Sequence, residues 1–302
     1  MGKGGCALPA LAPGAGRHGW NRSGHEMISG TTKLIGHIGF PTESFKSPMI
    51  YNPYFEREGI DAVVVPMGCE VPDYPSFLKL FFRLSNALGT LITMPHKVTT
   101  LSLVDEASPT AAIAGACNAV RRREDGRLEG DLFDGEGFVR GMRRKGRVIE
   151  GTHALVVGAG GVGSAIAASL ARAGVARITL FDSHPEAALQ LAERLKRHYP
   201  ALEVEVGVND PAGCDIVVNA TPLGMRAGDP LPVEVERVAP SAFVGEVVMT
   251  HEITPFLAAV RARGCAFQVG TDMLFEQIPA YFEFFGLPPT TPEALRAAAQ
   301  LD

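Results

Sequence analysis

Two charged residues, Lys97 and Asp134, stand where the sequence can place proton-transfer chemistry. Lys97 follows the apolar run LITM at 91–94, and Asp134 directly precedes the segment that links the two halves of the chain. Open α/β sheets bind ligands beyond the carboxyl ends of their strands, so both side chains are predicted to face a cleft between two domains. A lysine beside a carboxylate can exchange a proton with a substrate hydroxyl. Taken alone, Lys97 is also compatible with a solvated surface lysine.

A glycine-rich stretch at 154–174, ALVVGAGGVGSAIAASLARAG, is the second feature with chemical meaning. It predicts a buried strand, a tight turn and a helix that Gly174 ends. The glycines let the backbone approach a pyrophosphate, whose charge the helix N-terminus stabilises. The alternative is a structural glycine turn in another kind of α/β protein. The residues expected to line the cofactor here are Gly158, Ala159, Gly160, Gly161, Val162 and Gly163.

An acid, Asp182, ends the next apolar run about twenty residues after the glycine turn, as in dinucleotide-binding folds. Such an acid accepts hydrogen bonds from the adenosine ribose hydroxyls and repels a 2′-phosphate. Ser183 and His184 follow it, and no arginine or lysine stands within the next several residues. We therefore expect the cofactor to be NAD, with NADP less suited.

Buried strand patterns alternate with helical patterns along most of the chain, which predicts an α/β protein. The expected architecture has two domains: an N-terminal α/β substrate domain and a doubly wound Rossmann domain that binds a dinucleotide. Strands are predicted at 32–40, 61–69 and from 89, with a helix at 75–88 and a hairpin around Asp125–Gly126.

Domain boundaries follow from these patterns. Residues 1–28, rich in Gly, Ala and Pro, are expected to be a disordered leader or extension. Residues 29–134 together with 271–302 should form the substrate domain, because the helical tail is expected to return to the first half. Residues 135–270 should form the dinucleotide-binding domain.

The composition of the chain limits the kinds of molecule that it is expected to bind. The net charge of −5 provides no basic field for nucleic acid or anionic lipid, and no apolar run reaches membrane-spanning length. The five cysteines are scattered without a metal-ligand spacing, which favours a cytoplasmic protein without a structural metal. We expect a small-molecule substrate, no nucleic acid, no membrane, and a monomer or homodimer.

Along residues 32–286 the chain resembles the shikimate dehydrogenase family. The segments that carry the resemblance are GFPTESFKSP (39–48), LITMPHK (91–97), GACNAV (115–120), GDLFDGEGF (130–138), GAGGVGSA (158–165), NATPLGM (219–225), TPFL (254–257) and GTDMLFEQ (270–277). The resemblance implies an oxidoreductase that interconverts a cyclic hydroxy acid, similar to shikimate or quinate, and its ketone by hydride transfer with a nicotinamide cofactor.

The same resemblance implies roles for individual residues. Lys97 is implied as the acid/base and Asp134 as its partner. Residues implied in substrate binding are Ser47, Thr93, Asn118 and Gln277, with Ser44 as a further candidate. Residues implied along the cofactor are Asn219, Ala220, Thr221, Met249, Gly270 and Met273. Plain structural interpretations stay open for Asn118 as a turn residue, Gln277 on a solvated helix face and Met273 in the core.

Several positions depart from the family pattern. Phe45 stands where a serine is usual and displaces Ser44 by one, Leu91 stands for an asparagine, Leu132-Phe133 for an Asn-Thr pair, and Met249 for a tyrosine. The acid/base pair is kept while the polar lining is reduced, so we expect shikimate itself to be a poor substrate. Two other functions stay open: a non-catalytic sensor of a nucleotide or metabolite, and a dehydrogenase for an unrelated small hydroxy acid.

Overall fold

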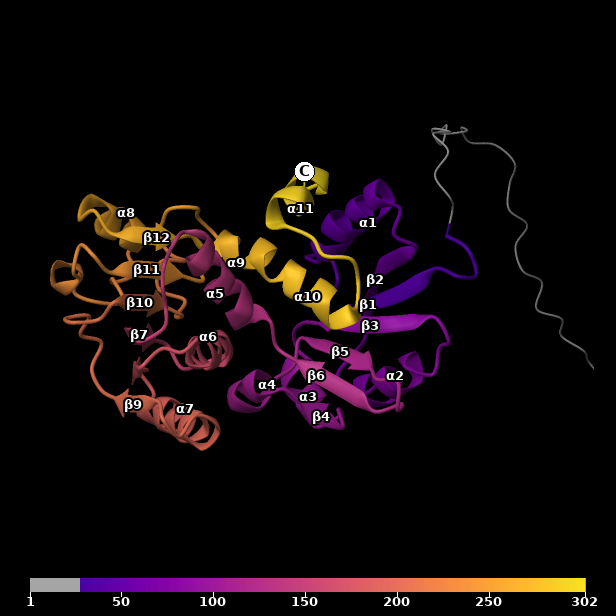
Figure 1. Ribbon diagram of the computed structural model, residues 1–302, viewed down its shortest axis with the longest axis horizontal. Coiled ribbons are helices and arrows are strands. Elements are labelled where there is room, and N and C mark those ends of the chain that lie inside the picture. Colours follow the sequence, from indigo (N-terminus) through magenta and orange to yellow (C-terminus); the bar gives the residue numbers. More distant parts are fainter. Residues whose placement is uncertain (1–27, 302) are drawn as a thin grey trace, which may run out of the picture.

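The protein is described by a computed structural model over residues 28–301. Two six-stranded sheets, each with helices packed against it, lie side by side along the long axis of the molecule (Figure 1). This arrangement confirms the expected α/β architecture. The expected leader, apart from residue 28, lies outside the described residues.

The first sheet has the strand order β2-β1-β3-β5-β6-β4. Its strands are β1 (Lys33–Gly39), β2 (Ala62–Gly68), β3 (Ala87–Ile92), β4 (Glu106–Ala107), β5 (Ala119–Arg122) and β6 (Leu128–Asp131). β1 pairs in parallel with β2 and β3, whereas β5 runs antiparallel to both β3 and β6. The end of β3, the start of β5 and the end of β6 therefore meet at one edge of the sheet.

Helices from both ends of the chain cover the first sheet. They are α1 (Ser47–Glu58), α2 (Tyr74–Phe81), α3 (Lys97–Leu101), α4 (Pro109–Ala114), α10 (Ile278–Phe285) and α11 (Pro292–Ala298). One core joins Ile35 of β1 and Phe55 of α1 to Phe282 of α10 and Leu295 of α11. The tail packs against the first sheet, and Figure 1 shows α10 and α11 beside α1 and that sheet.

Helix α2 is shorter than its apolar spacing predicts. It ends at Phe81, whereas the sequence predicts a helix over 75–88, because Ala87 and Leu88 belong to β3. Leu34 of β1 pairs with Ala87, so ladder hydrogen bonds to β1 override the local helical pattern.

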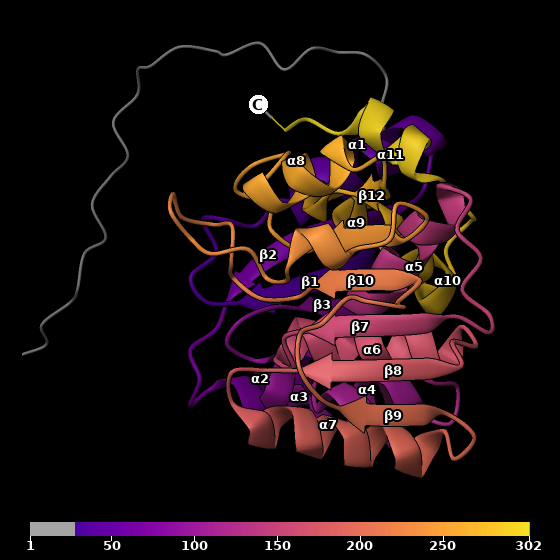
Figure 2. The ribbon, with the colours of Figure 1, turned by 90° about the vertical axis from the view of Figure 1, so that its left-hand side faces the viewer.

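The second sheet is parallel throughout, with the order β12-β11-β10-β7-β8-β9. Its strands are β7 (His153–Val157), β8 (Arg177–Phe181), β9 (Glu203–Val206), β10 (Ile216–Asn219), β11 (Phe243–Glu246) and β12 (Ala266–Gln268). The elements between them are α6 (Gly161–Arg172), α7 (Pro185–His198), the short 3-10 helix η1 (Val235–Arg237) and α8 (Pro255–Ala262). The order reverses direction at β7, as in a doubly wound Rossmann fold, and Figure 2 shows β9, β8, β7 and β10 in succession.

Helices α5 (Asp134–Arg144) and α9 (Gly270–Glu276) join the two halves. A Cβ on Gly135 would lie 2.0 Å from the carbonyl oxygen of Ala165 in α6, and one on Gly137 would lie 2.6 Å from that of Met273 in α9. Only glycine permits this backbone approach, so α5 is wedged between α6 and α9 directly after Asp134. The sequence GEG therefore fixes where Asp134 sits relative to the second sheet.

Three further observations concern the described residues. No helix among them is long and apolar enough to cross a membrane. Within residues 28–301, no group of three or more His, Cys, Asp and Glu side chains could hold a metal ion. Cys69, Cys117, Cys214 and Cys265 are all buried and free of disulfide bonds.

Candidate active site

Lys97 and Asp134 meet at the edge where β3 and β6 end. Lys97 opens α3 five residues after β3, and Asp134 opens α5 three residues after β6. Lys97 Nζ lies 2.7 Å from Asp134 Oδ2, with 29% of the lysine side chain and 12% of the aspartate side chain exposed. The structure thus brings together the two residues that the sequence singles out, in a partly buried ion pair that solvent and a ligand can reach.

Asn118 completes this arrangement from the start of β5. Its Nδ2 donates to Asp134 Oδ1 at 3.0 Å, and its Oδ1 accepts from the N–H of Phe133 at 3.0 Å. The side chain is 2% exposed. Each Asp134 oxygen therefore has its own partner, one cationic and one neutral, which holds the carboxylate in a single orientation. Asn118 acts here on Asp134 and on the backbone before α5.

Other expected substrate residues surround this pair at different depths. Thr93 follows β3 and is half-buried, and its N–H donates to the carbonyl of Ile38 at 2.9 Å. Ser47 opens α1 and is half-buried, whereas Ser44 is exposed. Gln277 packs against the first turn of α5, since a Cβ on Gly137 would lie 2.8 Å from its Cβ. Gln277 Oε1 is buried without a hydrogen-bond partner among the described residues, unlike the solvated helix face left open above.

His37, which the sequence patterns do not single out, lies under this site. It stacks on Phe45 with ring centroids 4.0 Å apart, and Phe45 Cζ approaches Gly39 beside the methyl group of Thr93. Burial, and secondly the Lys97 ammonium, lower the pKa of His37 to about 4, so its imidazole is neutral at pH 7. Its Nδ1 has no partner in the described part of the chain. The signal that could have revealed it is a histidine near the carboxyl end of a buried strand.

The other departures from the family pattern fall in different places. Leu91 is 4% exposed and belongs to the core that includes Phe133, also buried. It therefore replaces a polar residue beneath the site, and the expectation that Leu91 lines the substrate is not met. Met249 is 52% exposed on the loop after β11. Of these side chains, Phe45 is the one that changes the wall next to Thr93.

The glycine turn has the geometry that a dinucleotide needs. Gly158 adopts φ = 103°, a left-handed conformation that favours glycine. A Cβ on Gly163 would lie 1.9 Å from the carbonyl oxygen of Gly158, which locks α6 onto the turn. Gly160 and Gly161 are exposed with open space where a Cβ would stand, and Val162 is half-buried behind them. The backbone at the start of α6 can therefore be approached closely by a phosphate.

Asp182 does not stand free beside the glycine turn. Its Oδ2 accepts from the N–H of Ala159 at 2.7 Å and its Oδ1 from the N–H of His184 at 2.8 Å. Burial by itself raises the pKa of Asp182, but these N–H groups outweigh it and lower the pKa. Both oxygens thus organise the turn itself, whereas the sequence interpretation assigns them to ribose hydroxyls alone.

The remaining expected cofactor residues lie at the carboxyl edge of the second sheet. Asn219 ends β10 fully buried, with Ala220 and Thr221 half-buried after it. Asn219 Oδ1 accepts from Thr221 N and Oγ1 at 3.1 and 2.6 Å. Gly270 opens α9 against the carbonyl of Val248, where a Cβ would lie 2.0 Å away. Met273 is 6% exposed and packs in the core of the second sheet.

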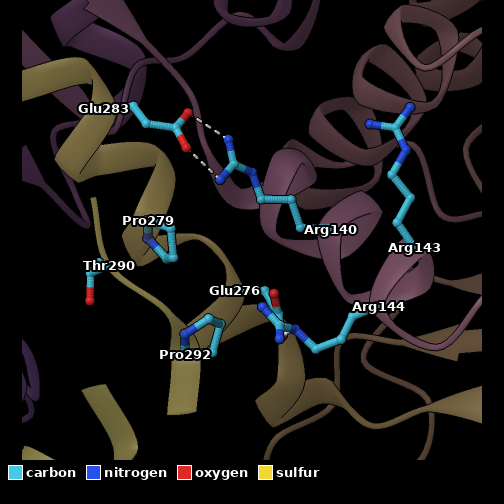
Figure 3. A pocket seen from close by; sticks show the side chains of 8 residues that line it. All are labelled: Arg140, Arg143, Arg144, Glu276, Pro279, Glu283, Thr290 and Pro292. Atoms are coloured by element: carbon cyan, nitrogen blue, oxygen red, sulfur yellow. Dashed lines mark hydrogen bonds and ion pairs between the residues drawn. The ribbon is translucent and has the colours of Figure 1, made fainter. Parts of the chain in front are cut away.

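A separate hollow of about 330 Å³ lies along α5, between α9, α10 and the start of α11 (Figure 3). None of the expected site residues lines it. Its arginines are already paired: Arg140 binds both oxygens of Glu283 at 2.9 and 2.7 Å, and Arg144 contacts Glu276 at 2.5 Å. These ion pairs hold α5 against α9 and α10. Because the charges of Arg140 and Arg144 are already paired, the hollow is not a candidate for the active site.

Comparison with known proteins shows to which family the chain belongs. Residues 37–120 match the model of the shikimate dehydrogenase substrate binding domain, and residues 140–184 match the ThiF family model. The shikimate dehydrogenase (NADP(+)) of Rubrobacter xylanophilus is 40% identical over 278 residues, 89% of this chain and 96% of that protein. The chain belongs to the shikimate dehydrogenase family.

Further members of the shikimate dehydrogenase family agree. The shikimate dehydrogenase (NADP(+)) of Acidiphilium cryptum is 35% identical over 91% of this chain and 99% of that protein. Shikimate 5-dehydrogenase of Listeria monocytogenes, solved with shikimate and NAD, has a TM-score of 0.83 at 26% identity and covers 90% of this chain and 98% of that one. The expected family, fold and oxidoreductase activity on shikimate-like hydroxy acids are thus confirmed. The sensor and the unrelated dehydrogenase find no support.

The expectation of NAD as cofactor is wrong by the same comparison. Curated relatives of this chain, among them those of Acidiphilium cryptum, Rubrobacter xylanophilus and Rhodospirillum rubrum, are named shikimate dehydrogenase (NADP(+)), and one solved neighbour of this family is in complex with NADP(+). The structure gives a physical reason for the error, because both carboxylate oxygens of Asp182 accept backbone N–H groups. An acid at this place in the sequence can serve the glycine turn, so its presence alone does not establish that the site selects the free ribose of NAD.

Proposed function

We propose that the chain catalyses the NADP-dependent interconversion of a cyclic hydroxy acid, of the shikimate or quinate type, and its ketone. The observation that supports this most is the Lys97–Asp134 pair at 2.7 Å with Asn118 on the other carboxylate oxygen. It lies on the first sheet, while the glycine turn for the dinucleotide lies on the second. Under this proposal, residues 29–134 with 271–302 bind the substrate and residues 135–270 bind the cofactor.

In the proposed mechanism, Lys97 moves one proton at the oxygen of the reacting carbon. Its ammonium donates to the ketone oxygen in reduction, and the amine accepts the hydroxyl proton in oxidation. Asp134 holds Lys97 Nζ in place, and Asn118 holds Asp134. A nicotinamide cofactor held by the backbone around the glycine turn would supply the hydride chemistry.

Binding roles for the surrounding residues belong to the same proposal. Thr93, Ser47 and Gln277 would contact substrate oxygens, with the unpartnered Gln277 Oε1 as the clearest open acceptor. The backbone from Gly158 to Gly163 would hold the pyrophosphate, with Asn219, Ala220, Thr221, Met249 and Gly270 along the nicotinamide half. Ser183 and His184 are exposed beside Asp182 and would lie near a 2′-phosphate under this proposal. Cytoplasmic location and the monomeric or dimeric state stay predictions.

The test is reduction of NADP, followed by absorbance, against a panel of cyclic hydroxy acids that includes shikimate and quinate. We expect turnover of at least one of them, and a higher kcat/KM with NADP than with NAD. Absence of turnover across the panel would contradict the proposed reaction. A higher kcat/KM with NAD would contradict the proposed cofactor and leave the reaction standing.

A further inference from the structure

Glu246, which none of the considerations above assigns to the site, sits where the loops around the cofactor begin. It is the last residue of β11 and is 0% exposed. In the parallel register it lies opposite Asn219, the last residue of β10, which is also 0% exposed. The loops after these strands carry Ala220 and Thr221 on one side and Met249 on the other. A buried acid thus stands at the root of two loops that are proposed to hold the nicotinamide.

The carboxyl group of Glu246 binds the end of one of these loops, and its residue pairs with the one that begins the other. Thr254 Oγ1 donates to Glu246 Oε2 at 3.0 Å and also accepts from Leu257 N at 3.2 Å, so the end of the 247–254 loop is bound to the acid and to α8 at once. On the other side, Asn219 Nδ2 donates to the carbonyl of Leu223 at 3.0 Å. Burial raises the pKa of Glu246, and hydrogen bonds with Thr254 and Asn219 offset part of that rise.

Both loops then contact the rest of the cofactor-binding backbone. A Cβ on Gly158 would lie 2.8 Å from the carbonyl oxygen of Ala220, so the loop after β10 packs on the glycine turn. A Cβ on Gly270 would lie 2.0 Å from the carbonyl of Val248, so the loop after β11 packs on the start of α9. A displacement at Glu246 would therefore reach both the glycine turn and the start of α9.

One oxygen of this buried acid is left over. Glu246 Oε1 is buried and has no hydrogen-bond partner among the described residues. An unpaired buried oxygen opposes folding, so a group kept in this state needs an explanation beyond stability. For stability alone, an apolar residue would be expected at the end of β11. Val217 of β10 and Val244 of β11 are examples of such buried apolar residues in the same two strands.

We propose that Glu246 is a positioning residue for cofactor binding: through Thr254 and Asn219 it holds the loops after β10 and β11 at the spacing that the nicotinamide half of the cofactor needs. This inference rests on the proposed function, since it assumes that these loops bind a nicotinamide nucleotide. Glu246 itself touches neither substrate nor cofactor in this proposal. A neutral group of the same shape should serve as well as the acid, because burial favours the uncharged form of the carboxyl.

The experiment compares Glu246→Gln with Glu246→Ala in the full chain. Dissociation constants for NADPH are measured by fluorescence titration without substrate, followed by KM for both substrates and kcat. We expect Glu246→Ala to raise Kd and KM for the cofactor by about tenfold, the upper end of what one hydrogen bond contributes. The KM for the hydroxy acid should stay unchanged, and Glu246→Gln should bind NADPH within about threefold of the unaltered protein.

Glu276→Gln serves as the matched control, because Glu276 is another buried acid with a pKa raised by burial, paired with Arg144 at the far end of α9. It should alter thermal stability without altering Kd for NADPH. If Glu246→Ala does not fold, Thr254→Val, which removes the donor to the same carboxyl, takes its place. Unchanged cofactor affinity in the folded variant would overturn the inference. Failure of the unaltered protein to bind NADPH would instead contradict the proposed function.

Discussion

The proposed role of Lys97 in proton transfer can be tested most directly. Replacing it by alanine removes the group proposed to move the proton, so kcat should fall by ~10²–10⁴-fold. Cofactor affinity should persist, because the glycine turn lies on the other sheet. Steady-state kinetics and NADPH titration measure both. Lys79→Ala, on the exposed face of α2, is the control. Near-full kcat in Lys97→Ala would show an ordinary surface lysine.

Phe45 is expected to set how well shikimate is used. Its ring occupies the wall beside Thr93 where the family usually has a serine, and a hydrogen bond to a carboxylate contributes ~1.5–3 kcal/mol. Phe45→Ser should therefore raise kcat/KM for shikimate by about 10- to 150-fold. The control is Phe40→Ser, which alters a half-exposed phenylalanine of the same loop. A low micromolar KM for shikimate in the unaltered protein would refute this interpretation.

His37 should make the protein sensitive to acid. Its pKa is lowered to about 4 in the folded chain against 6.5 as the ordinary value, so the unfolded chain binds a proton more readily between these values. Stability is full above pH 6.5 and is lost as the pH falls, by about 2 kcal/mol from pH 7 to pH 5. In His37→Gln, the fall in the free energy of unfolding from pH 7 to pH 5, measured by urea unfolding, should be smaller by about 2 kcal/mol. His198→Gln, at the exposed end of α7, should lose as much as the unaltered protein.

Sequence and structure differ most instructively at single residues. Lys97, Asp134 and the glycine turn could be predicted because each lies within a few residues after the end of a strand, and strand ends meet at a sheet edge. His37 could not, since its environment depends on Phe45 and Lys97, which arrive from other segments. Asp182 was interpreted wrongly for a related reason: its place in the sequence does not reveal that Ala159 and His184 already donate to it.

At the scale of elements, the contact between α5 and α6 leaves no space for a side chain at Gly135. The absence of a side chain at Gly135 lets the two helices approach, and an added methyl group would lie 2.0 Å from the carbonyl oxygen of Ala165. Gly135→Ala should destabilise the protein by about 1–3 kcal/mol and displace Asp134, which lowers kcat as well. Denaturant unfolding and kinetics test this together. Gly30→Ala, with open space around its Cβ, should change neither.

Elements with strong periodicity were predictable, and short ones were not. The strands β1 and β2 match the predicted ranges 32–40 and 61–69 to within one residue at each end, because an apolar run defines each of them. The two-residue β4 and the six-residue α4 have no such pattern: β4 exists because Glu106 and Ala107 pair with β6, and α4 is capped by Ser108, whose Oγ accepts from Ala111 N at 3.1 Å. Tertiary pairing and a single cap define them.

At the scale of the whole molecule, the tail is part of the first half. Leu295 in α11 is fully buried in the core shared with Ile35 and Phe55. Leu295→Ala should cost about 2–5 kcal/mol of stability, whereas the affinity for NADPH should stay the same because the second sheet lies elsewhere. Thermal unfolding and titration distinguish the two. Ala297→Gly, at a position not in that core, should cost about 1 kcal/mol. An equal loss of stability in both variants would contradict the conclusion that α11 stabilises the first half through Leu295.

The return of the tail also has a consequence for how the chain matures on the ribosome. The second sheet is built from one continuous stretch, 153–268, and can fold as soon as that stretch has emerged. The first sheet emerges earlier, yet the side covered by Phe282 and Leu295 stays open until α10 and α11 have emerged. A nascent chain that lacks α10 and α11 should therefore expose an apolar face of the first sheet. The half that is made first is completed last.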